Sequence, residues 1–142
     1  MLLPLVNRSS GGGTTPLPEI VYFVESGKAN FNLSFVNAVK AIQIADCIDL
    51  AAPNYSYSND TFYTGPCNKM YITAANGGST RRYVGYSLLT SIGTFVPCYD
   101  SSSTDIKTFS CSIPTDTYIK LALQTGGNAY DVYVYSWFLT KE

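Results

Sequence analysis

The sequence contains no histidine and is poor in charge. Only 13% of its 142 residues are Asp, Glu, Lys or Arg, and the formal net charge is −1. The chain therefore lacks the commonest general base and the commonest metal ligand in proteins. It also lacks the basic surface that nucleic-acid-binding proteins carry. These absences argue against acid–base catalysis and against a nucleic-acid partner.

No pair of cysteines has the C-x-x-C spacing of a zinc or redox motif. Without histidine, a zinc site would need all four thiolates, from Cys47, Cys67, Cys98 and Cys111, which are scattered along the chain. We therefore expect no metal and no cofactor. Cys47 and Cys111 lie in strand-like patterns and are predicted to be small buried hydrophobic residues. We expect mostly reduced thiols, and any disulfide that forms is predicted to join Cys67 to Cys98, since both lie next to proline.

Long hydrophobic runs are also missing, so no membrane span is expected. The apolar segment 1–6 is shorter than the core of a signal peptide, which predicts synthesis in the cytoplasm without export. A Gly/Ser-rich linker follows, and we interpret residues 1–18 as an extended N-terminal arm. The arm is either a disordered tail or a segment that docks on a neighbouring subunit through Leu2, Leu3, Leu5 and Val6.

The motifs of common enzymes are absent as well. No G-x-S-x-G, S-x-x-K or phosphate-binding glycine loop occurs, and we expect no enzymatic activity. Asp46 and Asp49 are predicted to lie on opposite faces of a strand as solvated acids, and Arg81–Arg82 to be solvated charges on opposite faces. Asp100 and Asp105 could bound a calcium loop, but the dense carboxylate spacing of such loops is missing.

What the sequence does contain favours β structure. Aromatic residues make up 14% of the chain, including 12 tyrosines, and short segments of alternating polarity recur from residue 20 onward. We predict an all-β domain over residues 19–142, an antiparallel β-sandwich or jelly roll of about eight or nine strands. Segment 36–50 is compatible with a short helix, but isoleucine recurs there at a spacing of two, which favours a strand.

The last strand, predicted over residues 130–139, is bulky on both sides. One face is expected to carry Val132, Val134 and Phe138. The other face is expected to carry Tyr133, Tyr135 and Trp137. Such a strand is either central in its sheet or covered by another subunit, so the second face is a predicted partner-binding surface.

Aromatic and amide side chains are also concentrated between residues 54 and 63. Tyr55, Tyr57 and Tyr63 occur there with Asn59 and Asp60. Aromatic rings beside amides and carboxylates are typical of a sugar-binding site, and tyrosine is also common in protein interfaces. A third interpretation is that the rings only cover the open end of the sandwich.

The chain resembles the small all-β proteins of tailed-bacteriophage particles, such as head decoration (cement) proteins and fibre-tip domains. The resemblance lies in the Leu/Pro and Gly/Ser-rich start, the Ser/Thr/Tyr-rich strands and the ending at 126–137. It implies a non-enzymatic structural protein of the virion, present in many copies and bound between capsid or tail subunits. The alternative hypothesis is a carbohydrate-binding, receptor-binding β-sandwich module.

Overall fold

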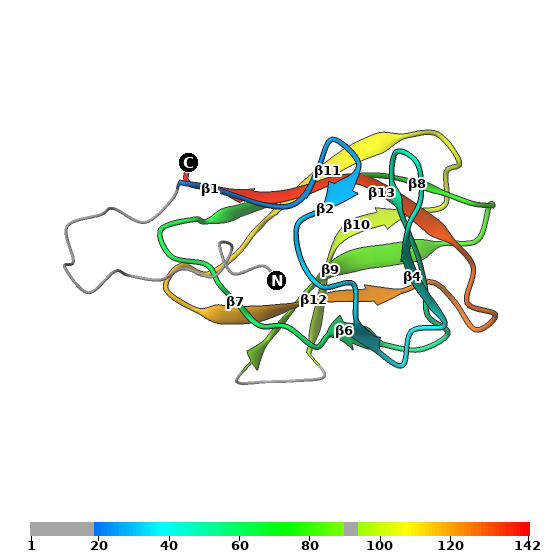
Figure 1. Cartoon of the computed structure of the whole chain (residues 1–142), viewed down its shortest axis with the longest axis horizontal. Helices are drawn as coiled ribbons and strands as arrows, with labels where there is room; N and C mark the ends of the chain where they lie inside the picture. Colours follow the sequence, from blue (N-terminus) through cyan, green and yellow to red (C-terminus); the bar gives the residue numbers. More distant parts are fainter. Residues whose placement is uncertain (1–18, 90–93) are drawn as a thin grey trace.

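The computed structural model describes residues 19–89 and 94–142, which form two antiparallel β-sheets (Figure 1). Sheet A is seven-stranded and contains β1 (Ile20–Glu25), β2 (Lys28–Ala29), β4 (Lys40–Gln43), β5 (Ile48–Ala51), β8 (Lys69–Asn76), β11 (Lys107–Ser112) and β13 (Val132–Thr140). Sheet B is six-stranded and contains β3 (Phe35–Val36), β6 (Ser56–Ser58), β7 (Phe62–Tyr63), β9 (Arg82–Leu88), β10 (Phe95–Ser101) and β12 (Tyr118–Gln124). The predicted β-sandwich is thus confirmed. The described residues hold more strands than predicted because several are only two residues long.

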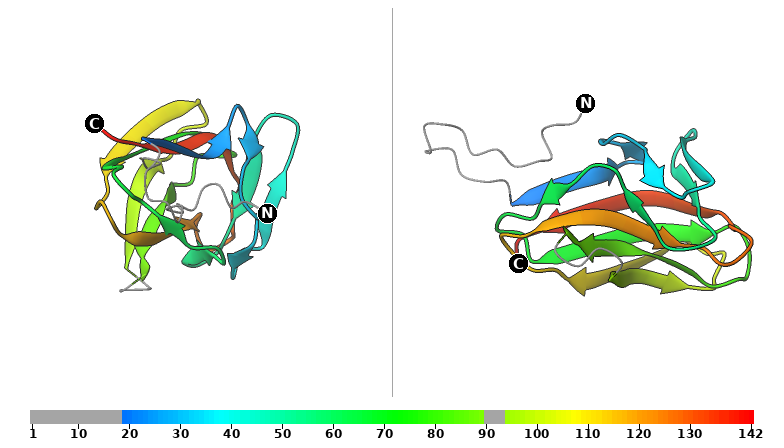
Figure 2. Two further views of the ribbon diagram at one scale, coloured as in Figure 1. Left: turned by 60° about the vertical axis from the view of Figure 1, so that its left-hand side comes forward. Right: turned by 90° about the horizontal axis from the view of Figure 1, so that it is seen from below.

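The hydrophobic core lies between the two sheets. Alternation along the long strands places one side of each strand inward, as in β12, where Ile119, Leu121 and Leu123 are fully buried. The central strand of sheet A is β13, which pairs with β8 on one side and with β5 and then β1 on the other. The left view of Figure 2 shows β12 (orange) and β13 (red) in separate layers. No helix in the described part of the chain is long and apolar enough to span a membrane.

A β-bulge in β13 overturns the predicted division of its two faces. The pairing with β8 shifts by one residue between Val134 and Ser136, so that Tyr135 is the extra residue. Beyond the bulge the side-chain phase is reversed. Trp137 is therefore fully buried in the core, and Phe138 lies on the outer face. The prediction of Trp137 as a partner-binding residue was wrong.

Segment 36–50 contains strands, as the sequence favoured, and no helix. It forms a hairpin of β4 and β5 and not one continuous strand. The turn of this hairpin packs on Gly27, where a Cβ atom would collide with the carbonyl oxygen of Asp46. Gly27 has a φ of +79°, and its N–H donates to the carbonyl of the bulged Tyr135 at 2.9 Å. The Gln43 side chain joins the β4–β5 hairpin to the β1–β2 hairpin. It donates to Gly27 O at 2.6 Å and accepts from Ala29 N–H at 2.8 Å.

The disulfide differs from the predicted pairing. Cys98 of β10 is bonded to Cys111 of β11, with Cα atoms 5.3 Å apart, and the predicted Cys67–Cys98 bond was wrong. Cys111 is therefore a bridging residue and not a core thiol, whereas Cys47 is buried as predicted. The pairing was hidden in the sequence because it depends on how the edges of two different sheets meet. The bond joins sheet B to sheet A along one side of the sandwich.

Removing this disulfide should destabilise the protein. The bond closes a short loop, with a sequence separation of 13 residues, so we expect the double variant Cys98→Ala/Cys111→Ala to lose about 2 kcal/mol in the free energy of unfolding. Urea denaturation with and without dithiothreitol measures this loss. The reductant should lower the stability of the wild type and leave the double variant unchanged. An equal response of both proteins to the reductant would contradict the prediction.

Candidate functional site

The outer face of sheet B carries a concentration of aromatic side chains. On β12, Tyr118, Lys120, Ala122 and Gln124 alternate with the core residues and so lie on the outer side of the strand, where Ala122 is nevertheless fully buried. Cross-strand register adds residues from the neighbouring strands to this face. They are Tyr57, Tyr63, Tyr83, Gly85, Ser87 and Phe95. We call this surface, with Tyr55, the aromatic face of sheet B.

One group of rings lies towards the β6 side of this face. The Tyr55 ring lies between two others, with its centroid 5.3 Å from that of Tyr57 and 5.7 Å from that of Phe95. Both pairs are tilted, at interplanar angles of 33° and 51°, so no ring is covered by a parallel neighbour. The Lys120 ammonium lies 5.8 Å from the Tyr57 ring centroid. The structure thus brings Tyr55 and Tyr57 together, as predicted, and adds Phe95 from β10.

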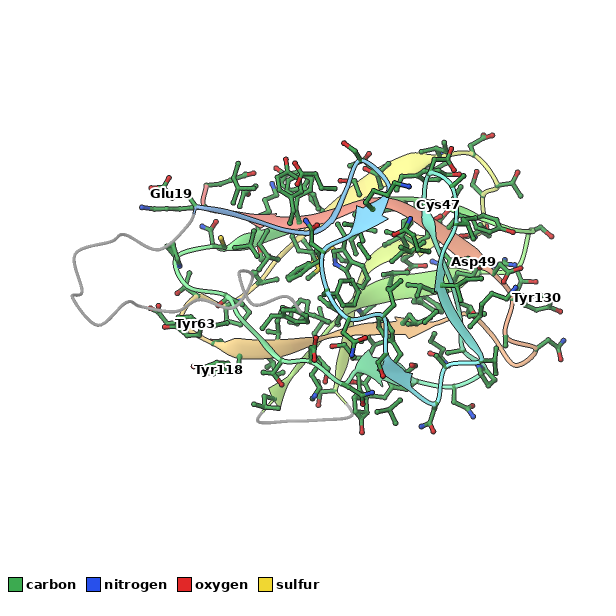
Figure 3. The ribbon with its side chains drawn as sticks, in the orientation of Figure 1. Glu19, Cys47, Asp49, Tyr63, Tyr118 and Tyr130 are labelled. Carbon is green, nitrogen blue, oxygen red and sulfur yellow. A yellow bond between two sulfur atoms is a disulfide. The ribbon has the colours of Figure 1, made fainter. Side chains whose placement is uncertain are left out.

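A second aromatic pair lies at the start of β12. The rings of Tyr63 and Tyr118 are 4.9 Å apart, and Tyr118 is 51% exposed (Figure 3). The Tyr63 hydroxyl donates to the Asp116 carboxylate at 3.1 Å, and this bond raises the pKa of Tyr63 above its ordinary value. From Tyr118 to Gln124 the strand extends about 20 Å at about 3.3 Å per residue. The face is therefore long enough for an extended ligand.

The predicted polar residues of this site have other partners. The Asn59 side-chain amide donates to the Ser34 hydroxyl, and the Asn59 main-chain carbonyl accepts from Lys120 Nζ at 3.0 Å. For Asp60 only the main chain is engaged, since its carbonyl accepts from the Ser58 hydroxyl at 2.7 Å. The polar group that the structure places among the rings is Lys120. Alternation on β12 was visible in the sequence, but only the strand pairing shows that Lys120 and Tyr118 meet the loop tyrosines.

Two hydroxyls of the aromatic face lack hydrogen-bond partners. Tyr55 Oη and Ser87 Oγ are buried and make no hydrogen bond, and Asp49 Oδ1 is the third such side-chain atom in the described part of the chain. A buried hydroxyl without a partner costs about 1–3 kcal/mol. Both hydroxyls are closed to solvent, so a ligand would meet them only after neighbouring side chains had moved. The aromatic face thus combines apolar rings with unsatisfied polar groups.

The outer face of sheet A carries a different aromatic arrangement. The Phe138 ring lies between Tyr22, at 5.1 Å, and Tyr71, at 5.2 Å. The Tyr71 and Phe138 rings are nearly parallel, at 12°, and Lys69 lies over Tyr71. The Tyr71 and Phe138 rings thus cover one another's faces, as cross-strand pairs that stabilise a sheet do, whereas Tyr22 is tilted by 40° against Phe138. We therefore regard this row as structural and use it as a control surface.

The predicted partner-binding residues fall into three groups. Leu2, Leu3, Leu5 and Val6 belong to the arm and lie outside the described residues. Tyr133 and Tyr135 are partly buried on sheet A, where burial raises the pKa of both phenols. Trp137 is in the core. Binding of a partner by the arm and the two tyrosines stays a prediction.

A buried carboxyl group corrects the prediction that Asp49 is solvated. Asp49 is only 7% exposed, and the Lys40 ammonium lies 3.5 Å from its Oδ2 and 3.0 Å from Asp131 Oδ1. Burial, followed by the adjacent Asp131 carboxylate, raises the pKa of Asp49 to about 6, although Lys40 opposes the shift. Asp46, in the hairpin turn, is exposed as predicted. Figure 3 places Asp49 far from Tyr63 and Tyr118, so this carboxyl group is separate from the paired rings at the start of β12.

The two arginines also have different environments. Arg81 is exposed and paired with Asp100 at 2.6 Å, whereas Arg82 is 1% exposed and was wrongly predicted to be solvated. Arg82 Nε donates to Asp131 O at 2.7 Å and Nη1 donates to Gly78 O at 3.0 Å. Burial lowers the pKa of Arg82. Arg82 thus holds the β8–β9 turn against the start of β13.

The calcium loop considered for Asp100 and Asp105 is not supported. The Asp100 carboxylate is engaged by Arg81, and the Asp105 N–H donates to the Ser103 hydroxyl at 3.0 Å. Over residues 19–89 and 94–142, no group of three or more acidic or cysteine side chains is placed to hold a metal ion.

Comparisons with known proteins bear on the fold. No family model and no curated protein matches the chain. Among solved structures, the family 29 carbohydrate-binding module CBM29_1 from Piromyces equi is similar, with a TM-score of 0.62 and 15% identity over 87% of this chain and 90% of that one. The CBM51 from Clostridium perfringens GH95, solved with methyl-galactose, has a TM-score of 0.42 and 12% identity over 89% of this chain and 91% of that one. The first similarity shows that the chain has the β-sandwich fold of that module.

Proposed function

We propose that this protein is a non-enzymatic glycan-binding β-sandwich, and that the aromatic face of sheet B is its binding surface. The observation that carries the proposal is the presence of two groups of tilted, partly exposed rings on one sheet face. Sugar rings have apolar C–H faces that pack on aromatic rings, and binding sites combine such rings with a few polar groups. The carbohydrate-binding module of similar fold supports the same class of ligand.

The virion role stays a prediction. It rests on the resemblance of the sequence to phage structural proteins, and the predicted contacts involve the arm, Tyr133 and Tyr135. Carbohydrate binding has more support because it draws on residues that the structure brings together. The two roles are compatible, because the sequence also resembles fibre-tip domains and the alternative hypothesis is a receptor-binding module that binds carbohydrate.

Single alanine substitutions test the proposed surface. Screening on a glycan array identifies a ligand, and isothermal titration then gives its affinity for the wild type and for Tyr57→Ala and Tyr118→Ala. We expect each variant to bind about tenfold more weakly, because removing an aromatic side chain at the centre of a binding surface costs about 1–2 kcal/mol. The matched control is Tyr22→Ala, which removes a partly exposed ring from the outer face of sheet A.

The control defines the outcomes. Affinity should be unchanged in Tyr22→Ala, because that ring lies on the other sheet. An equal loss in all three variants would show that the aromatic face of sheet B is not the specific site. A wild-type protein that binds no glycan on the array would contradict the proposed function itself.

A further inference from the structure

We propose that the glycan bound by the aromatic face of sheet B is anionic, and that Lys120 binds its acidic group. The inference rests on the proposed function and names the ligand class. It concerns a carboxylate, as in uronic acids, or a sulfate ester. Both present the oxygen acceptors and negative charge that a fixed ammonium group recognises.

Lys120 is held in place by backbone carbonyls. Its Nζ donates to Ser58 O at 3.1 Å and to Asn59 O at 3.0 Å, while the ammonium lies over the Tyr57 ring. An ammonium group has three donors, so these two bonds leave one for a ligand. Because the long side chain is already ordered by these contacts, binding a ligand costs less conformational entropy than at a free lysine.

Lys120 has no acidic partner in the part of the chain that the structure describes. None of the ion pairs between described residues involves Lys120, whereas Arg81, at the end of the same sheet face, is paired with Asp100. Carbonyl dipoles orient an ammonium group and leave its net charge in place. A positive charge flanked by aromatic rings, and with no counter-ion among the described residues, favours an anionic ligand over a neutral one.

Ser87 lies next to Lys120, but its hydroxyl is closed to solvent and is not a donor for a ligand in this structure. The two residues are direct cross-strand partners on β9 and β12, and Ser87 Oγ is one of the buried hydroxyls without a partner. Tyr118 precedes Lys120 by two residues and Tyr57 pairs with Ala122, two residues beyond it, so rings lie on both sides of the charge.

Titration calorimetry with matched ligands tests the inference. The probes are oligogalacturonates, the same oligomers with their carboxylates reduced to alcohols, and sulfated galactan oligomers. We expect the wild type to bind at least one acidic series about tenfold more tightly than the reduced neutral oligomers, a difference of about 1.4 kcal/mol. This preference should shrink as the salt concentration rises. The acidic series that binds better distinguishes a carboxylate site from a sulfate site.

Two variants and one control complete the experiment. Lys120→Met should lose the acidic preference while still binding the neutral oligomers, and Lys120→Arg should keep part of it. The control Lys107→Met removes an exposed lysine from β11 of sheet A and should change nothing. Circular dichroism confirms that each variant is folded, and the salt dependence of the wild type tests the charge without any substitution.

The outcomes separate this inference from the proposed function. Equal binding of acidic and reduced oligomers by the wild type, or an acidic preference that survives in Lys120→Met, overturns the role of Lys120 and leaves glycan binding intact. If the wild type binds neither the acidic nor the neutral oligomers, both proposals are overturned.

Discussion

Replacing Trp137 with alanine should lower the free energy of unfolding by about 3–5 kcal/mol, the range found for buried tryptophan and phenylalanine. Trp137 is fully buried, its ring lies edge-on to Phe23 at 6.2 Å, and its indole N–H points to the Met70 sulfur at 3.4 Å. Truncation therefore removes a large apolar side chain and leaves a cavity between the sheets. Urea denaturation followed by circular dichroism measures the loss.

Phe138→Ala is the comparison that makes this experiment a test of the bulge. Phe138 lies on the outer face between Tyr22 and Tyr71, and we expect its truncation to cost about 1–2 kcal/mol. Without the bulge at Tyr135, regular alternation would put Phe138 in the core and Trp137 outside. A larger loss in Phe138→Ala than in Trp137→Ala would contradict the observed register. Trp137→Phe, which keeps much of the volume, covers the case in which the alanine variant does not fold.

Lowering the pH from about 7.5 to about 5 should increase the stability of the protein by about 1–2 kcal/mol. In the folded chain the pKa of Asp49 is about 6, above the ordinary 3.8, because burial and Asp131 disfavour its charged form. The folded state therefore binds a proton more tightly than the unfolded state, and stability rises as the pH falls through the folded pKa. The chain has no histidine to titrate in this window.

Asp49→Asn should remove this pH dependence. The amide is neutral at all pH values and leaves Lys40 paired with Asp131 at 3.0 Å, so we expect a gain of at most about 3 kcal/mol at pH 7.5. The matched control is Asp46→Asn, an exposed residue of the same hairpin, which should keep the wild-type slope. Urea midpoints at several pH values give both slopes. A wild type equally stable across this range, or an Asn variant that still depends on pH, would contradict the assignment.

Part of the candidate site could be predicted from the sequence. Tyr55, Tyr57 and Tyr63 stand out as a local concentration of rings, and two of them do lie together at 5.3 Å. Tyr63 instead pairs with Tyr118, and the central charge comes from Lys120, both about 60 residues away along the chain. Local composition identifies the residue types. The contacts across strands depend on register, which the sequence leaves open.

The sequence by itself determined the fold class and the chemistry that is missing. Alternating polarity with abundant tyrosine specifies sheets with one buried face, and the lack of histidine removes the usual catalytic base whatever the fold. Only the tertiary structure decided which bulky residue of β13 is buried, which cysteines pair, and that Asp49 and Arg82 are inside. The physical reason is the same in each case. Side-chain direction in a strand has a period of two, so one extra residue at Tyr135 exchanges the faces, and pairing between distant strands is set by packing of the whole core.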